Sequence, residues 1–166
     1  LTDANIEKIN TLEFTGTVYT VATGGTITTD GDYKVHTFNS SATFEVTTLG
    51  TDAVVEYLVI AGGGGASPSD GNFGGGGGAG GYKTATGFSI TEASFSITVG
   101  GGGALETQGS SSVFSSITSA GGGRGGRRNQ YAGGDGGSGG GGNEASPSGA
   151  GSASPSGQGN DGGGGI

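Results

Sequence analysis

The side chains best suited to specific recognition gather in one short segment between glycine runs. Arg127 and Arg128 are followed closely by Gln130 and Tyr131. Arginine forms charge-assisted hydrogen bonds of defined geometry, and a tyrosine ring offers rigid contact surface at low entropic cost. Together these residue types are able to hydrogen-bond to, and stack on, a sugar or a protein.

The same region contains an Arg-Gly-Gly unit of the kind that disordered RNA-binding segments use. Here the unit occurs once, at Arg124, in a chain of formal net charge −8. An acidic chain is a poor partner for phosphate backbones and for anionic membranes. We therefore expect no nucleic-acid partner. We also expect no membrane insertion, because no apolar run approaches the roughly 20 residues of a membrane span.

Signatures of catalysis and metal binding are weak. His36 is the only histidine and has neither a second candidate ligand nor a nucleophile beside it. The carboxylates of the glycine-rich part are scattered and lack the paired arrangement that hydrolysis needs; they are Asp70, Glu106, Asp135, Glu144 and Asp161. We expect no enzymatic activity and no resident metal, and we leave calcium binding by the acidic inserts open as an alternative.

The segment 58–65 imitates a strand that enters a dinucleotide-binding loop, because any glycine run satisfies the spacing of that loop. Ser67-Pro68-Ser69 follows, and this sequence cannot open the helix whose N-terminus would hold a pyrophosphate. We expect no nucleotide and no other cofactor. Cysteine is absent, which excludes disulfides and thiolate metal sites.

The elements that must position these side chains divide at Ala61. Only five of the 44 glycines precede that residue. The organisation that we expect is a connecting or oligomerising segment at 1–31, a β-strand region at 32–61, and a glycine-rich domain at 62–166 with returning strands at 88–99. The predicted fold class is therefore all-β, with a small antiparallel sheet followed by a glycine-rich bundle.

Strand-forming residues separated by turn signals extend from Thr15 to Ile60. The nearly all-apolar segment 54–60 should be the most buried strand, and the alternating segments 88–90 and 95–99 should join it in one sheet. Earlier in the chain, 2–5 offers a helix cap, and Ile6, Ile9 and Leu12 follow at three-residue spacing. This spacing predicts a short helix or a packed entry segment that faces a partner.

The glycine runs have two interpretations. Glycine loses more backbone entropy on folding than any other residue, which favours a flexible linker. Yet the runs alternate with residues that need burial, such as Phe95, Ile97, Phe114 and Ile117. The ordered alternative is a bundle of polyproline-II-like helices with three residues per turn, whose backbones bond laterally because no side chain intervenes. Isolated substituents such as Ala79, Arg124, Asp135 and Ser138 would then point outward.

The order of these segments resembles the glycine-rich domain of phage tail fibres, and in particular the tip adhesin of T-even-type phages with its polyglycine II helices. The likeness rests on segments 35–46, 54–65, 75–82, 96–100, 111–114 and 117–121. It implies a virion tail-fibre component, located outside the cell, whose variable inserts contact a host surface receptor, a protein or a glycan. It also implies other fibre subunits as partners and a homotrimer.

Runs of similar length laid side by side bring the inserts to the ends of the bundle, and loops on a rigid scaffold are where binding residues concentrate. We therefore expect receptor contact at one end, through the inserts 66–73, 127–132 and 143–161. The candidate receptor-binding residues are Phe73, Arg127, Arg128, Gln130, Tyr131, Asn143, Ser146, Pro147, Ser154 and Pro155.

Two other functions fit parts of the sequence. A subunit of an extracellular glycine-rich filament or matrix would need an exposed self-complementary surface, for which the strand edge is the candidate. An ice-binding protein would need a regular array of small residues, whereas these inserts differ in length and carry arginine, glutamine and aromatic residues. The composition of the inserts favours receptor binding over both.

Overall fold

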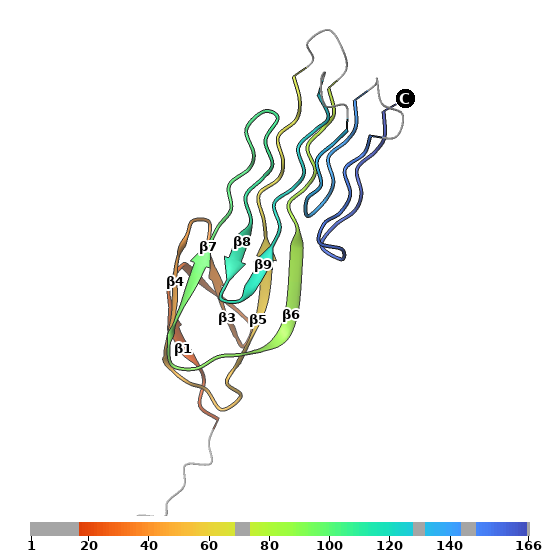
Figure 1. Cartoon of the computed structure of the whole chain (residues 1–166). Coiled ribbons are helices and arrows are strands. Elements are labelled where there is room, and N and C mark those ends of the chain that lie inside the picture. The colour runs from red at the N-terminus through yellow and green to blue at the C-terminus, as the bar shows by residue number, and fades with distance from the viewer. Residues whose placement is uncertain (1–16, 69–73, 128–131, 144–148, 166) are drawn as a thin grey trace, which may run out of the picture.

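The computed structural model describes residues 17–68, 74–127, 132–143 and 149–165, and these residues contain no helix. The predicted short helix at 2–12 lies outside them. The described strands are β1 (Val21–Thr23), β2 (Thr26–Asp30), β3 (Tyr33–Thr37), β4 (Ala42–Thr48), β5 (Val54–Ile60), β6 (Tyr82–Ser89), β7 (Ser94–Thr98), β8 (Ser112–Phe114) and β9 (Ile117–Ser119) (Figure 1). The all-β class predicted from the sequence is confirmed.

The strands form three antiparallel sheets rather than the single sheet predicted. One sheet has the order β1-β4-β7-β8-β9, and β2-β3 and β5-β6 each form a two-stranded sheet. As predicted, β6 returns to pair with β5, but β7 pairs with β4 and β8 instead. The physical reason is that a single open sheet would leave one apolar face bare, whereas facing sheets bury those faces against each other.

Aromatic side chains fill the space where these sheets pack. Phe44 of β4, Val59 of β5 and Phe114 of β8 are buried in one cluster. The Phe114 ring centroid lies 5.0 Å from that of Phe88 and 6.1 Å from that of Phe95. These two pairs are tilted, whereas the Phe44 and Phe114 rings, 6.3 Å apart, meet edge to face. The edge-to-face arrangement is favourable beyond the area that it buries.

The β5 strand is less buried than its apolar sequence predicted. Val59 is buried, whereas its neighbours Leu58 and Ile60 are exposed on the outer face. Successive side chains of a strand point to opposite faces, and only the inner face of β5 is covered. A run of apolar residues therefore does not by itself indicate a strand buried on both faces.

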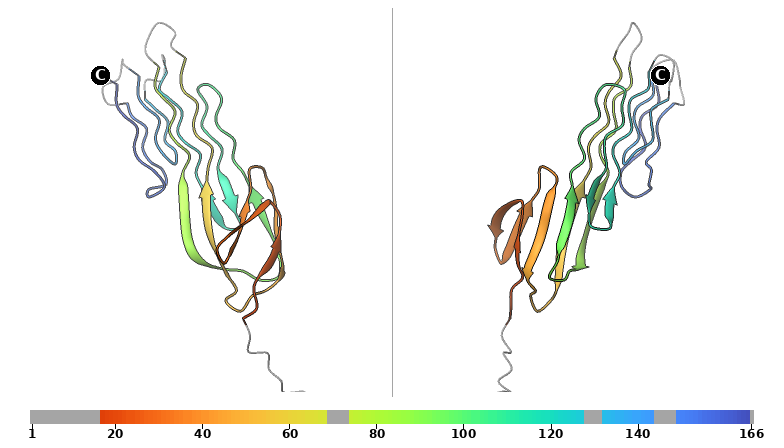
Figure 2. Two further views of the ribbon diagram at one scale, coloured as in Figure 1. Left: turned by 180° about the vertical axis from the view of Figure 1, so that it is seen from behind. Right: turned by 60° about the vertical axis from the view of Figure 1, so that its left-hand side comes forward.

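The glycine runs continue directly from the strands and lie side by side beyond one end of them (Figures 1 and 2). The run 61–67 follows β5, and 120–127 follows β9. The run 74–81 leads back into β6. The strand core and the glycine runs are thus one continuous set of chain segments, and each run starts in a direction that a strand fixes.

Hydrogen bonds between neighbouring runs recur at every third residue. The N–H groups of Ala61, Gly64 and Ser67 donate to the carbonyls of Gly81, Gly78 and Gly75 at 3.0, 2.8 and 3.0 Å. The N–H groups of Gly75, Gly78 and Gly81 in turn donate to the carbonyls of Gly126, Gly123 and Ala120 at 3.0, 2.7 and 2.7 Å. The same three residues of the run 74–81 therefore bond to both neighbouring runs, since their carbonyls accept from 61–67 and their N–H groups donate to 120–127.

Glycine is required where these backbones touch. A Cβ atom at Gly78 would collide with the carbonyl oxygen of Ser138, and one at Gly65 with that of Ala104. At Gly76, on the outside of its run, nothing lies within 4 Å of the same built atom. The isolated substituents sit at such outer positions, since Ala79 and Asp135 are exposed. Arg124 and Ser138 are half-buried.

We predict opposite effects of one methyl group at two neighbouring glycines. Gly78→Ala should lower the free energy of unfolding by about 1–3 kcal/mol, because its methyl meets fixed backbone. Gly76→Ala should leave it unchanged or raise it by about 0.4–1 kcal/mol, because it restricts the unfolded chain without a clash. Urea unfolding of both variants measures the difference. Equal effects would show that the runs are not packed as described.

Candidate functional site

The molecule has two distinct ends. The described chain begins at residue 17 at the end of the strand region, whereas the glycine runs extend from the other end (Figures 1 and 2). The run 61–67, the hairpin at 100–112 and the run 120–127 all reach the tip farthest from the chain start. The first two inserts with predicted receptor residues, 66–73 and 127–132, continue from this tip.

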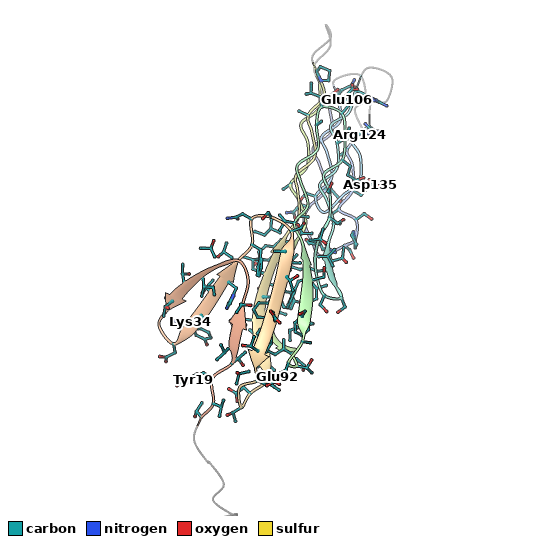
Figure 3. All side chains as sticks on the ribbon, turned by 90° about the vertical axis from the view of Figure 1, so that its left-hand side faces the viewer. Tyr19, Lys34, Glu92, Glu106, Arg124 and Asp135 are labelled. Atoms are coloured by element: carbon teal, nitrogen blue, oxygen red, sulfur yellow. The ribbon has the colours of Figure 1, made fainter. Side chains whose placement is uncertain are left out.

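A polar cluster centred on Glu106 joins three segments at the tip. Its carboxylate accepts a hydrogen bond from Arg127 Nη1 at 3.0 Å and one from Ser67 Oγ at 3.4 Å. Its backbone N–H donates to the carbonyl of Ala66 at 3.0 Å. Figure 3 labels Glu106 at this end of the glycine runs. One residue thus connects the starts of two inserts.

The ion pair contributes orientation more than stability. The Arg127 and Glu106 side chains are 39% and 33% exposed. Ion pairs as accessible as this one contribute about 0–1 kcal/mol, because water and salt screen them. The planar guanidinium still restricts where Arg127 can lie relative to Glu106.

Glu106 belongs to a tight turn. Thr107 donates to the carbonyl of Ala104 through both its N–H, at 3.0 Å, and its hydroxyl, at 2.8 Å. Glu106 has a φ of 59°, a left-handed conformation that is uncommon for residues other than glycine. Leu105, beside it in the turn, is 66% exposed.

The structure distributes the predicted site residues between both ends of the glycine region. Arg127 lies in the polar cluster around Glu106. Asn143 is buried, with 2% of its surface exposed, and it is not without an interaction partner. Ser154 and Pro155 are exposed in a loop at the strand-facing end, where the carbonyl of Gln158 accepts from Tyr82 N at 2.9 Å. Outside the described residues lie Phe73, Arg128, Gln130, Tyr131, Ser146 and Pro147.

The insert predicted at 143–161 is not a single loop. Within it Gly151 donates to Gly140 at 2.8 Å, and Asn160 accepts from Gly139 at 2.9 Å. Gly149 and Gly151 therefore belong to one further glycine run, and Gly159 and Gly162 belong to another. Gly157, with a φ of 81°, lies in the turn between these two runs.

The Asp135 and Asp161 side chains serve the turns of these last runs. Their carboxylates accept from the backbone N–H groups of Ser152 and Ala153, each at 2.7 Å. In the part of the chain that the structure describes, no group of three or more His, Asp or Glu side chains is placed to hold a metal ion. His36 lies in the strand region, with Nδ1 2.9 Å from the carbonyl oxygen of Gly24 and its ring against Phe44.

Leu105 and Glu106 were missed as site candidates from the sequence. Their insert, the segment 104–120 between two glycine runs, carries no recognition signal in its composition beyond one charge. Glu106 is the only charged residue in that insert. An isolated charge at the point where two glycine runs reverse direction is the signal that would have identified this turn.

The described residues include no helix that is long and apolar enough to cross a membrane. No curated protein matches this chain, and no solved structure does. A family model described as a glycine-rich domain matches residues 36–166, which include β4 to β9 and the glycine runs from 61 onward. The chain therefore belongs to the glycine-rich domain family.

Proposed function

We propose that this chain is a receptor-binding domain at the tip of a phage tail fibre, which attaches the virion to a host surface. The observation that carries the proposal is the separation of a connecting end from a tip. The described chain starts at one end, and the inserts that follow Ser67 and Arg127 start from one cluster at the other. Two distinct ends suit a domain that is anchored at its strand region and contacts a receptor at the tip of its glycine runs.

The scaffold fits this role because few side chains are needed to hold the glycine runs together. Neighbouring runs bond through backbone groups, so the sequence of an insert affects the scaffold little. Loops on rigid scaffolds commonly carry binding residues, since the scaffold limits the entropy lost on binding. The inserts alone would bind the receptor, a protein or a glycan.

We further propose that the runs are polyglycine II helices. Such helices have three residues per turn and no internal hydrogen bonds. The three-residue period of the bonds from 61–67 to 74–81, and from 74–81 to 120–127, supports this geometry. So does the close approach of backbones at Gly65 and Gly78.

Amide hydrogen exchange tests the order of these runs. The bonded N–H groups of Gly64, Gly78 and Gly123 should be protected, because opening any of them requires separating packed chains. The N–H of Gly76, which donates to no acceptor among the described residues, serves as the internal control and should exchange quickly. Uniformly fast exchange at all four glycines would mean that the runs are linkers.

We propose a homotrimer, in keeping with the symmetry of the fibres that the chain resembles. Residues 1–16 carry Ile6, Ile9 and Leu12, and they lead into exposed Tyr19 and Val21 at the start of the described chain. Apolar side chains at a connecting end gain stability when they pack against another subunit.

Sedimentation velocity tests this assembly. The full chain should sediment as a trimer at micromolar concentration, and a chain lacking residues 1–16 should sediment as a folded monomer. Circular dichroism of the shortened chain checks that the strands persist. A full chain that is folded and monomeric in this concentration range would contradict the proposal.

Adsorption to bacteria tests the receptor role. In a strain to which the intact domain adsorbs, replacing Arg127, Arg128 and Tyr131 together by serine should reduce adsorption by at least about tenfold. Loss of the Arg127–Glu106 ion pair should lower the free energy of unfolding by only about 0–1 kcal/mol. The matched control replaces Tyr33 and Lys34, in the exposed β3 strand away from the tip, by serine and should adsorb normally. Full adsorption by a folded triple variant would show that these three residues do not make the receptor contact and that it lies in other inserts.

A further inference from the structure

One outer face of the molecule extends without a break from the strands into the glycine runs. β5 continues into the run 61–67, the run 74–81 continues into β6, and the two lines remain hydrogen-bonded neighbours along their length (Figure 1). The inner face of β5 packs on the aromatic cluster, where Val59 is buried. The opposite face, which we call the lateral face, has Leu58, Ile60 and Ala66 along one line and Tyr82, Ala79 and Gly76 along the other.

The three-residue period of the runs sets which glycine positions belong to the lateral face. In the run that leads into β6, built Cβ atoms at Gly77 and Gly78 collide with two neighbouring runs, whereas one at Gly76 meets nothing. Three residues later Ala79 is exposed, and three residues after that Tyr82 is 53% exposed. One row of this run therefore faces outward and continues the outer side of β6.

The strand half of the lateral face is apolar. Leu58 and Ile60, at outward positions of β5, are 58% and 57% exposed. The outward positions of β7 carry Ser94, Ser96 and Thr98 instead, as expected of a strand with one solvated face. Contiguous apolar side chains at outward positions mark a surface that another protein covers.

The charge and shape of the lateral face suit a second copy of this chain. With 14 acidic and 6 basic side chains and a formal net charge of −8, two copies repel each other over most of their surfaces. The segments 54–67 and 74–82 contain one charged residue, Glu56, so repulsion is weakest on this side. Glycine and alanine also leave the glycine half of the face flat, and an identical flat face can lie against it.

The size of the lateral face indicates how this contact is held. The face extends about 45 Å, at a rise of about 3.3 Å per strand residue and about 3.1 Å per residue of a run, and it is about 10 Å wide. Its area of about 450 Å² is roughly half of the 800 Å² or so that each partner buries in a standard interface. Such a face joins chains that are already held together elsewhere, because tethering raises their effective concentration.

We propose that the lateral face is the side on which copies of this chain contact one another, with equivalent residues of each copy facing the symmetry axis of the assembly. Leu58, Ile60 and Tyr82 become buried in this contact. The inference rests on the proposed homotrimer, to which it adds the contact surface between the subunits.

Cross-linking tests the contact in the full chain, which contains no cysteine. Leu58→Cys treated with a short bifunctional maleimide should yield mostly chains linked in pairs, because the introduced thiols converge at the axis. Tyr33→Cys, on the exposed strand β3 and itself 64% exposed, is the matched control and should stay unlinked. Absence of linking at Leu58, or equal linking at both positions, in a chain that assembles would overturn the lateral contact.

Sedimentation of Leu58→Glu in the full chain gives a second measurement. Each copy then adds a carboxylate to a face that loses water on association, so the concentration at half-assembly should rise at least about tenfold. Tyr33→Glu should leave this concentration unchanged. Far-UV circular dichroism of both variants should match the unaltered chain, since both side chains are exposed in the isolated chain. An unchanged concentration for Leu58→Glu would overturn the proposal.

The outcomes separate the lateral contact from the functions that were proposed before it. Loss of adsorption by Leu58→Glu with unchanged assembly would show that the face binds the receptor and not a copy, which also overturns the lateral contact. A full unaltered chain that sediments as a folded monomer would reject the homotrimer and the lateral contact together. Adsorption of the variant of Arg127, Arg128 and Tyr131 would still decide the receptor role.

Discussion

The close approach of backbones that carry no side chains is the constraint on which the glycine region depends. Built Cβ atoms at Gly65 and Gly78 would collide with carbonyl oxygens of neighbouring runs. At that spacing each run exchanges N–H···O bonds with more than one neighbour. The backbone interactions that other domains confine to sheet ladders here extend in several lateral directions. They offset the entropy that glycine loses when it is ordered.

The strand region makes this packing achievable. A glycine run alone has no preferred register, because every position is alike. Runs that continue from β5, β6 and β9 inherit their start and direction from a hydrophobic core that is specific. Phe44, Phe88 and Phe114 thus help to set the alignment of residues that they do not touch. This division fits the extent of the family match, which includes β4 to β9 together with the glycine runs.

The sequence predicted the all-β class and the strands near 54–60, 88–90 and 95–99, because alternating apolar residues report local structure directly. It did not predict how those strands divide among sheets, since pairing partners depend on packing between faces. The outward direction of Ala79 and Asp135 was predicted correctly, because backbones that touch leave no room for a side chain between them. The run at 149–153 escaped notice because its glycines are interspersed with serine and alanine. The tip cluster also escaped notice, because the contacts of Glu106 with Ser67 and Arg127 span 39 and 21 residues.

The continuity between β5 and the run 61–67 has a mechanical consequence. Where a strand passes into a run without an intervening loop, a load applied at the tip travels along the covalent chain into the core. The bonds from Ala61, Gly64 and Ser67 link this run to its neighbour 74–81, which itself passes into β6. These hydrogen bonds are roughly perpendicular to a force applied along the runs. Such a force therefore loads them together in shear, and they do not open one after another. A domain built in this way would transmit force from its tip to its base with little extension.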